Sequence, residues 1–359
     1  MVVFSHVYAS AGYPYLAVGV VAGILDMLHS GVDLFFVLSG FCLYYPLTKT
    51  GDRRSWPEFF RRRAKRLLPP YYAAIATIAL LPFAIAPMAG YVGLIAGHAS
   101  WPSWHQLWTH LLLVHTLGTD TFFCLNGPFW SLGIEVQFYI AFPVAVWLVQ
   151  RLGWRGVCLI AALTVSYRIA CVSGVIPAYQ PIDLADLFPS RWLEFALGML
   201  VARQVRKNAQ QHLGIIQELT DLAGVVLVFL LVAYVLYGPL RQWPYPPKDL
   251  LFACLYSALL YRACCRGSLL GVVLGHRIPV WLGTISYSLY LIHLPIILAL
   301  GPSIMAQNLG LLGSLLGMAV VCVPLVVGGA TCFYVLFERP FLNRPPQPGI
   351  DLGSQMNRR

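Results

Sequence analysis

Long apolar runs, each bounded by charged residues or by proline and glycine, follow one another along most of the chain. A helix rises about 1.5 Å per residue, so about 20 apolar residues cross a hydrocarbon core about 30 Å thick. We therefore predict an all-α, polytopic membrane helix bundle of about ten transmembrane helices. The predicted spans are residues 1–9, 31–48, 70–96, 128–149, 154–173, 188–204, 220–238, 248–264, 279–300 and 311–337.

Composition supports a lipid environment. Of the 359 residues, 58% are hydrophobic and only 11% are charged, and the mean hydropathy is +0.71. Residues 67–119 and 278–337 contain no Asp, Glu, Lys or Arg, and each stretch is long enough for two spans. These values exclude an ordinary soluble domain.

The formal charge of +10 is concentrated in short connections between the apolar runs. This spacing follows the positive-inside rule, so the charge indicates topology and not a nucleic-acid partner. We expect both termini in the cytoplasm and the chain in the inner or plasma membrane, with the lipid bilayer as its partner. The basic clusters are Lys49 to Arg66, Arg151/Arg155, Arg203/Arg206/Lys207, Arg262/Arg266/Arg277 and Arg339/Arg344/Arg358/Arg359.

Two regions differ from the spans. Residues 98–119 hold Trp101, Trp104, His105, Trp108 and His110, which favour an interfacial or re-entrant segment. Residues 343–359 read as a short disordered cytoplasmic tail, so residues 1–342 form the one transmembrane domain. The nine cysteines lie mostly in apolar runs, and we expect no disulfide framework and no metal site.

Four acidic residues lie within or at the ends of the apolar spans: Asp33, Glu135, Glu194 and Glu338. A charge near the centre of a bilayer costs about 2.5–3.5 kcal/mol on insertion scales, so each acid suggests a function. Glu135 has a structural alternative, a buried ion pair with Arg168 or Arg191. For Glu338, beside Arg339 at a span end, an interfacial position is the stronger interpretation.

Two histidines in apolar segments are candidate bases. Acyl transfer to a hydroxyl needs a base with a pKa near the operating pH, and the neutral imidazole of His6 or His293 meets that need. A lone histidine on an apolar segment is also often a hydrogen-bonded core residue, so both roles stay open. The chain has no Ser-His-Asp order and no His-Cys ligand set, which disfavours hydrolase and metal mechanisms.

The basic loop is a candidate anion site. Arginine forks suit phosphates, and Arg63 and Arg66 lie three residues apart on one helical face, directly before Pro69-Pro70, where we expect the next span to start. The alternative is a topogenic signal whose bases contact anionic lipid headgroups.

Several stretches together resemble the acyltransferase 3 family of integral membrane O-acyltransferases, in order and spacing over almost the whole chain. Two of them are specific and the others are supporting. The stretches are Phe4-Ser-His6, Gly31-Val-Asp-Leu-Phe-Phe-Val-Leu-Ser-Gly-Phe41, Arg62-Arg-Ala-Lys-Arg-Leu-Leu-Pro-Pro-Tyr-Tyr72, Asn126-Gly-Pro-Phe-Trp-Ser-Leu-Gly-Ile-Glu-Val-Gln-Phe-Tyr139, Ile285-Ser-Tyr-Ser-Leu-Tyr-Leu-Ile-His293 and Phe337-Glu-Arg-Pro-Phe341.

The resemblance implies transfer of an acyl group, usually acetyl, from acyl-CoA to a hydroxyl of a carbohydrate, glycolipid or related acceptor. No permanently bound cofactor is implied, because acyl-CoA is a substrate. His6 becomes the catalytic histidine of the first helix, and Arg63 and Arg66 become the pair that holds the donor. Less certain roles fall to Asp33 and Glu135 in catalysis and to Trp130, Tyr287 and His293 in substrate binding.

Some alternatives remain. The family pattern places an arginine eleven positions before the catalytic histidine, which here lies upstream of Met1, so we expect a truncated first helix. A transporter or flippase would also place ionisable groups within spans, although we find no duplicated halves. A catalytically inactive scaffold is a third interpretation. Direct transfer and an acyl-histidine intermediate are both compatible with the sequence.

Overall fold

A computed structural model describes residues 1–10, 28–50, 55–84, 102–176, 186–207, 224, 248–265, 267–305, 307 and 309–342, and the described parts form helices and short connections. The predicted span at 220–238 and the predicted tail at 343–359 lie outside these residues. The longer helices are α1 (Val2–Ser10), α3 (Gly31–Tyr44), α5 (Trp56–Ala84), α7 (Trp104–Leu111), α8 (Phe129–Leu152), α9 (Trp154–Val172), α10 (Phe188–Lys207), α12 (Lys248–Ala263), α14 (Arg277–Thr284), α15 (Ser286–Met305) and α16 (Gly310–Phe333). The shorter elements are η1 (Leu28–Ser30), α4 (Leu47–Thr50), η3 (His115–Leu117), α13 (Leu269–Leu274), η6 (Tyr334–Glu338) and η7 (Arg339–Phe341).

The all-α class agrees with the prediction, but the number of about ten spans is not confirmed. Within the described residues, three helical stretches are long and apolar enough to cross a membrane, namely α8, α9 and Gly313–Phe341. The pair α14 and α15, which covers the predicted span at 279–300, would count as a fourth if it is one span, although it bends by 72° at the break. Helix α10 carries too many charged residues to count as a span, and α12, with 16 residues, is too short.

Helix α5 begins earlier than predicted. The sequence placed the start of a span at Pro69-Pro70, but the helix runs without a break from Trp56 through both prolines. Pro57 lies in its first turn, where a missing N–H removes no hydrogen bond. The arginines that looked like a loop are therefore on a continuous helix, which fixes their directions relative to the bundle.

Helices α3 and α10 cross closely at the centre of the bundle. A Cβ atom added at Gly40 of α3 would overlap the carbonyl of Phe195, and one added at Gly198 of α10 would overlap the carbonyl of Val37. Glycine is thus required at both positions for backbone contact, not for conformational freedom. The crossing buries Phe36 and Met199 in one hydrophobic cluster.

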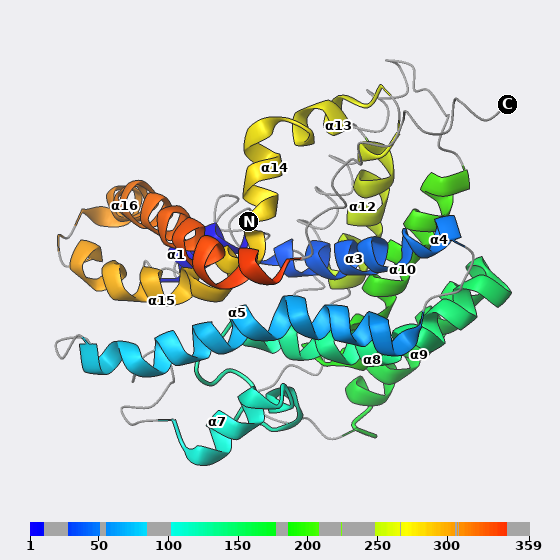
Figure 1. The fold of residues 1–359 in the computed structure, drawn as a ribbon, viewed down its shortest axis with the longest axis horizontal. Coiled ribbons are helices and arrows are strands. Elements are labelled where there is room, and N and C mark those ends of the chain that lie inside the picture. Colours follow the sequence, from blue (N-terminus) through cyan, green and yellow to red (C-terminus); the bar gives the residue numbers. More distant parts are fainter. Residues whose placement is uncertain are drawn as a thin grey trace, which may run out of the picture.

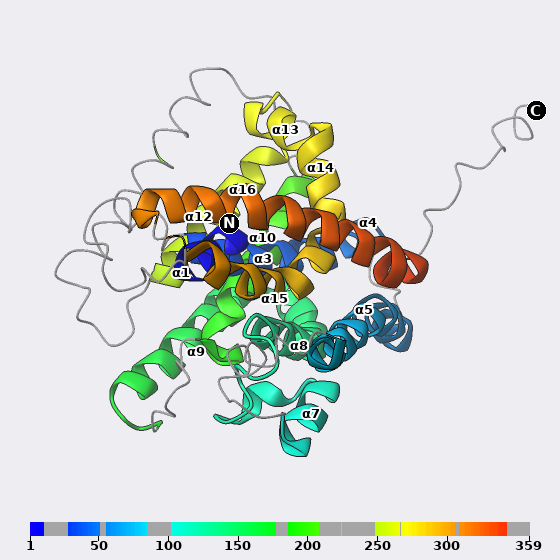
Figure 2. The ribbon, with the colours of Figure 1, turned by 90° about the vertical axis from the view of Figure 1, so that its left-hand side faces the viewer.

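The remaining helices lie on either side of this crossing. Helix α1 packs against α15 and α16, and together they form one side of the molecule in Figures 1 and 2. The short helix α7 lies at the lower edge in both views, below α8 and opposite α13 and α14. It begins with a capping box between Ser103 and Gln106 and has only eight residues, so it is too short to cross a bilayer, as expected for this segment.

Candidate active site

The two candidate histidines meet although they are far apart in the chain. Nδ1 of His6, on α1, lies 2.9 Å from Nε2 of His293, on α15, and the ring centroids are 4.9 Å apart. His293 is fully buried, whereas His6 is only partly buried. The structure thus joins two residues that the sequence could only propose separately.

The surroundings of His293 assign the protons of both rings. Its Nδ1 lies 2.8 Å from the carbonyl oxygen of Tyr290 and 3.2 Å from that of Leu289, and carbonyls only accept hydrogen bonds. Nδ1 of His293 must therefore carry a hydrogen, and in the neutral ring its Nε2 is an acceptor. His6 then donates from Nδ1, which leaves the lone pair of its Nε2 for chemistry.

Residues 126–131 hold α15 at the level of His293. The side-chain amide of Asn126 donates to the carbonyl of Leu291 at 2.9 Å. The Tyr290 hydroxyl donates to the carbonyl of Pro128 at 2.6 Å and lies 2.5 Å from the hydroxyl of Ser131. The family-like stretches at 126–139 and 285–293 therefore contact each other, and these hydrogen bonds fix the position of His293 along the bundle.

One helical turn earlier, α15 is attached to α5. The hydroxyl of Tyr287, predicted to bind substrate, donates to the carbonyl of Leu67 at 2.9 Å. Tyr287 and His293 are six residues apart, about 9 Å of helix rise. Helix α15 thus links the arginine-bearing helix to the histidine pair, and Tyr287, Tyr290 and His293 recur at a spacing that could have marked this face in the sequence.

Glu338 is buried and has a partner within the protein, which an interfacial position did not suggest. It ends the π-helical turn η6, and its carboxylate accepts from the backbone N–H and the hydroxyl of Ser288, at 3.2 and 2.5 Å. Ser288 lies in the first turn of α15, where backbone N–H groups lack helical partners. Glu338 therefore caps α15, a role that its position beside Arg339 did not suggest.

The basic face of α5 divides into two parts. Arg61 and Arg62 form ion pairs with Glu58, and the hydrogen bond from Arg61 lowers the pKa of that exposed carboxyl. Arg63 and Arg66 form no ion pair within 4.0 Å among the described residues, and the buried Nε of Arg63 has no hydrogen-bond partner there. These two guanidinium groups are available to an anion.

Glu135 lies in the field of that arginine pair. Its carboxylate accepts a hydrogen bond from Tyr139 at 2.5 Å and one from Ser39 at 3.4 Å, and the cations acting on it are Arg63 and Arg66. The alternative of an ion pair with Arg168 or Arg191 is therefore wrong, because both of those arginines have other partners. Glu135 therefore places a carboxylate near Arg63 and Arg66.

Asp33 lies in a different environment. It is buried in the first turn of α3, and its carboxylate is 2.5 Å from a guanidinium nitrogen of Arg191. The guanidinium group of Arg191 also pairs with Asp186, Glu194 and Asp249. Asp249 pairs with Arg168 as well. The complete cluster comprises Arg168, Arg191, Asp33, Asp186, Glu194 and Asp249 from α3, α9, α10, α12 and the residues before α10.

Trp130 belongs to the same region. The guanidinium carbon of Arg191 lies 5.9 Å from the centre of its ring, and Phe36 and Phe122 enclose the ring within the hydrophobic core. With only 5% of its surface exposed, Trp130 is core packing next to the ion cluster. Asp33 and Trp130 therefore share a contact with Arg191, whereas the ring contacts of His6 among the described residues are those with His29 and His293.

A second histidine pair lies outside the predicted spans. The rings of His110 and His115 stack with their centroids 4.1 Å apart, and both are fully buried. Burial lowers the pKa of His110 to about 4 and that of His115 to about 3. Both rings are therefore neutral near pH 7 and hold the 102–128 segment together.

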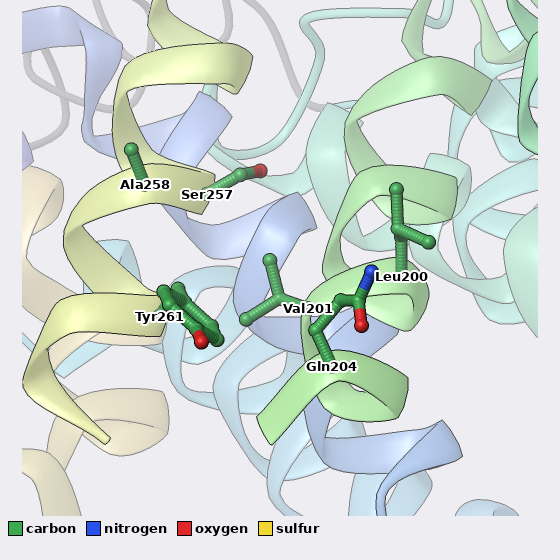
Figure 3. A pocket seen from close by; sticks show the side chains of 6 residues that line it. All are labelled: Leu200, Val201, Gln204, Ser257, Ala258 and Tyr261. Carbon is green, nitrogen blue, oxygen red and sulfur yellow. The ribbon is translucent and has the colours of Figure 1, made fainter. Parts of the chain in front are cut away.

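A cavity of about 370 Å³ lies away from these residues, between α10 and α12 (Figure 3). It is mostly apolar, and none of the described residues that line it is a predicted site residue. They are Leu200, Val201, Gln204, Ser257, Ala258 and Tyr261.

The described residues thus combine a histidine pair, two arginines without a carboxylate partner there and an apolar helix bundle, a combination that suits a membrane enzyme acting on an anionic substrate. The family model described as an acyltransferase domain matches residues 1–334, so the chain belongs to this acyltransferase family and is an acyltransferase of groups other than aminoacyl groups. This confirms the family suggested by the sequence.

Characterised relatives support that assignment. Acyltransferase MdmB of Streptomyces mycarofaciens is 27% identical over 91% of this chain and 86% of its own length. Exopolysaccharide production protein ExoZ of Rhizobium meliloti is 26% identical over 88% and 90%. Peptidoglycan O-acetyltransferase OatA of Listeria monocytogenes is 25% identical, but the 74% of this chain that matches spans only 44% of that protein. No solved structure matches the chain at a significant level.

Proposed function

We propose that this protein is a membrane-embedded O-acyltransferase that moves an acyl group, of which acetyl is the first candidate, from acyl-CoA to a hydroxyl of a carbohydrate or related acceptor. The observation that carries the proposal is the hydrogen bond between His6 and His293, which directs the remaining lone pair of His6 away from the buried ring. The names of two relatives, a peptidoglycan O-acetyltransferase and an exopolysaccharide production protein, favour a sugar acceptor.

In the proposed mechanism, Arg63 and Arg66 bind the phosphates of the donor, since neither is used by a carboxylate of the described residues. The lone pair at Nε2 of His6 then either takes the proton of the acceptor hydroxyl or attacks the thioester to give an acyl-histidine. His293 keeps Nδ1 of His6 engaged in both routes. Glu135 serves the donor side, where its carboxylate orients Tyr139.

The proposal includes an orientation. The basic clusters would face the cytoplasm, with both termini on that side of the cell membrane, so that Arg63 and Arg66 meet cytosolic acyl-CoA. The domain would extend over residues 1–342. Cysteine-scanning with a membrane-impermeant thiol reagent on intact cells tests this orientation.

Purified protein in liposomes with radiolabelled acetyl-CoA and a chito-oligosaccharide tests the activity. We expect labelled, alkali-sensitive ester on the sugar with the unchanged protein and none with His6→Ala. His276→Ala is the matched control, because His276 is an exposed imidazole at the start of α14. Ester formation by His6→Ala would contradict the mechanism. Labelled acetyl that crosses the membrane without ester would favour the transporter alternative.

A further inference from the structure

A third imidazole lies beside the histidine pair. The ring of His29, in η1, meets the ring of His6 edge-on, with centroids 6.5 Å apart and planes at 87°. We propose that His29 carries the reaction proton between His6 and bulk water, an inference that rests on the proposed function.

Exposure increases along the three rings. His293 is fully buried, His6 is partly buried and His29 is exposed, so the series runs from the interior of the bundle to its surface. The His6 ring therefore contacts one ring enclosed in the bundle and one ring accessible at the surface, directly before the predicted span at 31–48. The described residues supply no comparable titratable series on the other side of His6.

The inner end of the series is closed to proton release. A proton passed from His6 to His293 would sit on a ring whose Nδ1 is bonded to backbone carbonyls, and carbonyls do not take up a proton at ordinary pH. The hydroxyl proton must leave His6 before the next turnover begins. Of the two imidazoles whose rings contact His6 among the described residues, His29 is the exposed one, and an imidazole can both accept and release a proton.

In the direct route, all bonds and protons are accounted for when water accepts one proton and supplies another. The acyl C–S bond breaks and the acyl C–O bond forms, while the hydroxyl proton moves to Nε2 of His6. That proton then passes to His29 and to water. The leaving thiolate takes up a proton from cytosolic water, which yields free thiol and ester.

The position of His29 is fixed by its neighbours. Ser30, next in the chain, is buried, and its hydroxyl lies 2.6 Å from that of Tyr256 on α12. Gly31 follows, where a Cβ atom would crowd Val2 of α1 at 2.9 Å. These contacts hold η1 against α1 and keep the ring of His29 beside His6.

His29→Gln keeps a polar side chain of similar length but cannot exchange a proton at neutral pH. In liposomes with acetyl-CoA and chito-oligosaccharide, we expect kcat to fall about tenfold or more with the KM for acetyl-CoA unchanged, since general acid–base steps contribute about 10²–10⁴-fold. Added 4-methylimidazole should restore part of kcat in His29→Gln and should not affect His276→Gln, an exposed control.

Unchanged kcat in His29→Gln, or a loss that 4-methylimidazole does not restore, overturns the inference. If His6→Ala is inactive in the same assay, the proposed function survives that outcome. Turnover by His6→Ala would overturn both. A purely structural role of His29 would lower the yield of folded protein and would not respond to the added imidazole.

Discussion

Nδ1 of His6 donates to Nε2 of His293 at 2.9 Å, and Nδ1 of His293 donates in turn to the carbonyl of Tyr290 at 2.8 Å. The two hydrogen bonds end at a backbone carbonyl, which can only accept a hydrogen bond. The tautomer of the reactive ring is therefore set by the backbone geometry of α15. In the proposed mechanism, the buried imidazole of His293 orients His6 as a carboxylate orients the histidine of a catalytic triad.

Replacement of His293 should separate orientation from packing. Glutamine can present an amide oxygen near the position of Nε2, whereas leucine fills the volume without an acceptor. We expect His293→Leu to lower kcat at least about 10²-fold and His293→Gln to lower it less. Without an acceptor at position 293, the hydrogen of the neutral His6 ring can move to Nε2, where it blocks the lone pair needed for the reaction. Steady-state kinetics with folded protein, verified by size-exclusion chromatography, checks the order; equal activity of both variants would contradict it.

The two classes of arginine on α5 should differ in donor binding. Charge-assisted hydrogen bonds contribute about 1.5–3 kcal/mol, so Arg63→Ala or Arg66→Ala should raise the KM for acetyl-CoA about 10- to 100-fold. Arg61→Ala is the matched control, because Arg61 is exposed and paired with Glu58. The same KM change in all three variants would instead favour a topogenic role for the whole basic face.

The ion cluster around Arg191 contains four carboxylates and two guanidinium groups. Removal of Arg191 leaves buried acids without a partner, so Arg191→Gln should destabilise the fold by about 3–5 kcal/mol. Asp33→Asn removes one of the excess acids, and we expect a clearly smaller loss. Thermal unfolding in detergent measures both. A fully folded but inactive Asp33→Asn would return Asp33 to the catalytic group.

The crossing of α3 and α10 should tolerate no side chain. Gly198→Leu forces a branched side chain against the carbonyl of Val37, and overpacking of this kind costs about 1–3 kcal/mol or more. Gly328→Ala is the control, because a Cβ there meets nothing within 4 Å. The yield of monodisperse protein should fall for the first variant only; equal yields would contradict the close crossing.

Stability should fall in mild acid because of the stacked pair His110 and His115. Burial lowers their pKa values to about 4 and about 3, so below pH 6.5 the unfolded chain binds protons that the folded chain does not. Their contribution is therefore complete above about pH 6.5 and is lost as the pH falls towards 4 and 3. Melting temperatures between pH 7.5 and 5 should decline less steeply in a His110→Gln/His115→Gln variant; an unchanged slope would exclude the pair as the cause.

The sequence predicted individual residues better than their partners. His6, His293, Arg63 and Arg66 were recognisable from residue type and motif, but residues 287 positions apart meet only through helix packing. Hydropathy measures the cost of a buried charge and does not identify the group that neutralises it. For this reason Glu135 was assigned a possible partner in Arg191 that instead binds Asp33.

Backbone features were equally hard to foresee. The bend at Ile285 lies inside an uncharged stretch with no proline at the break, so composition gave no signal for it. Pro69 and Pro70 wrongly suggested the start of a helix, because the helix that begins at Trp56 continues through both prolines. Glu338 ends a π-helical turn, so a pattern with a period of 3.6 residues does not predict which way its side chain faces.

The acyl-transfer rates of four proteins test the central claim most directly: the unchanged chain, His6→Ala, His293→Ala and the double variant. If His293 acts only through His6, the double variant should be no slower than His6→Ala, and both should lack turnover above background. An unchanged rate in His293→Ala, or turnover retained by His6→Ala, would contradict the account of one histidine oriented by another.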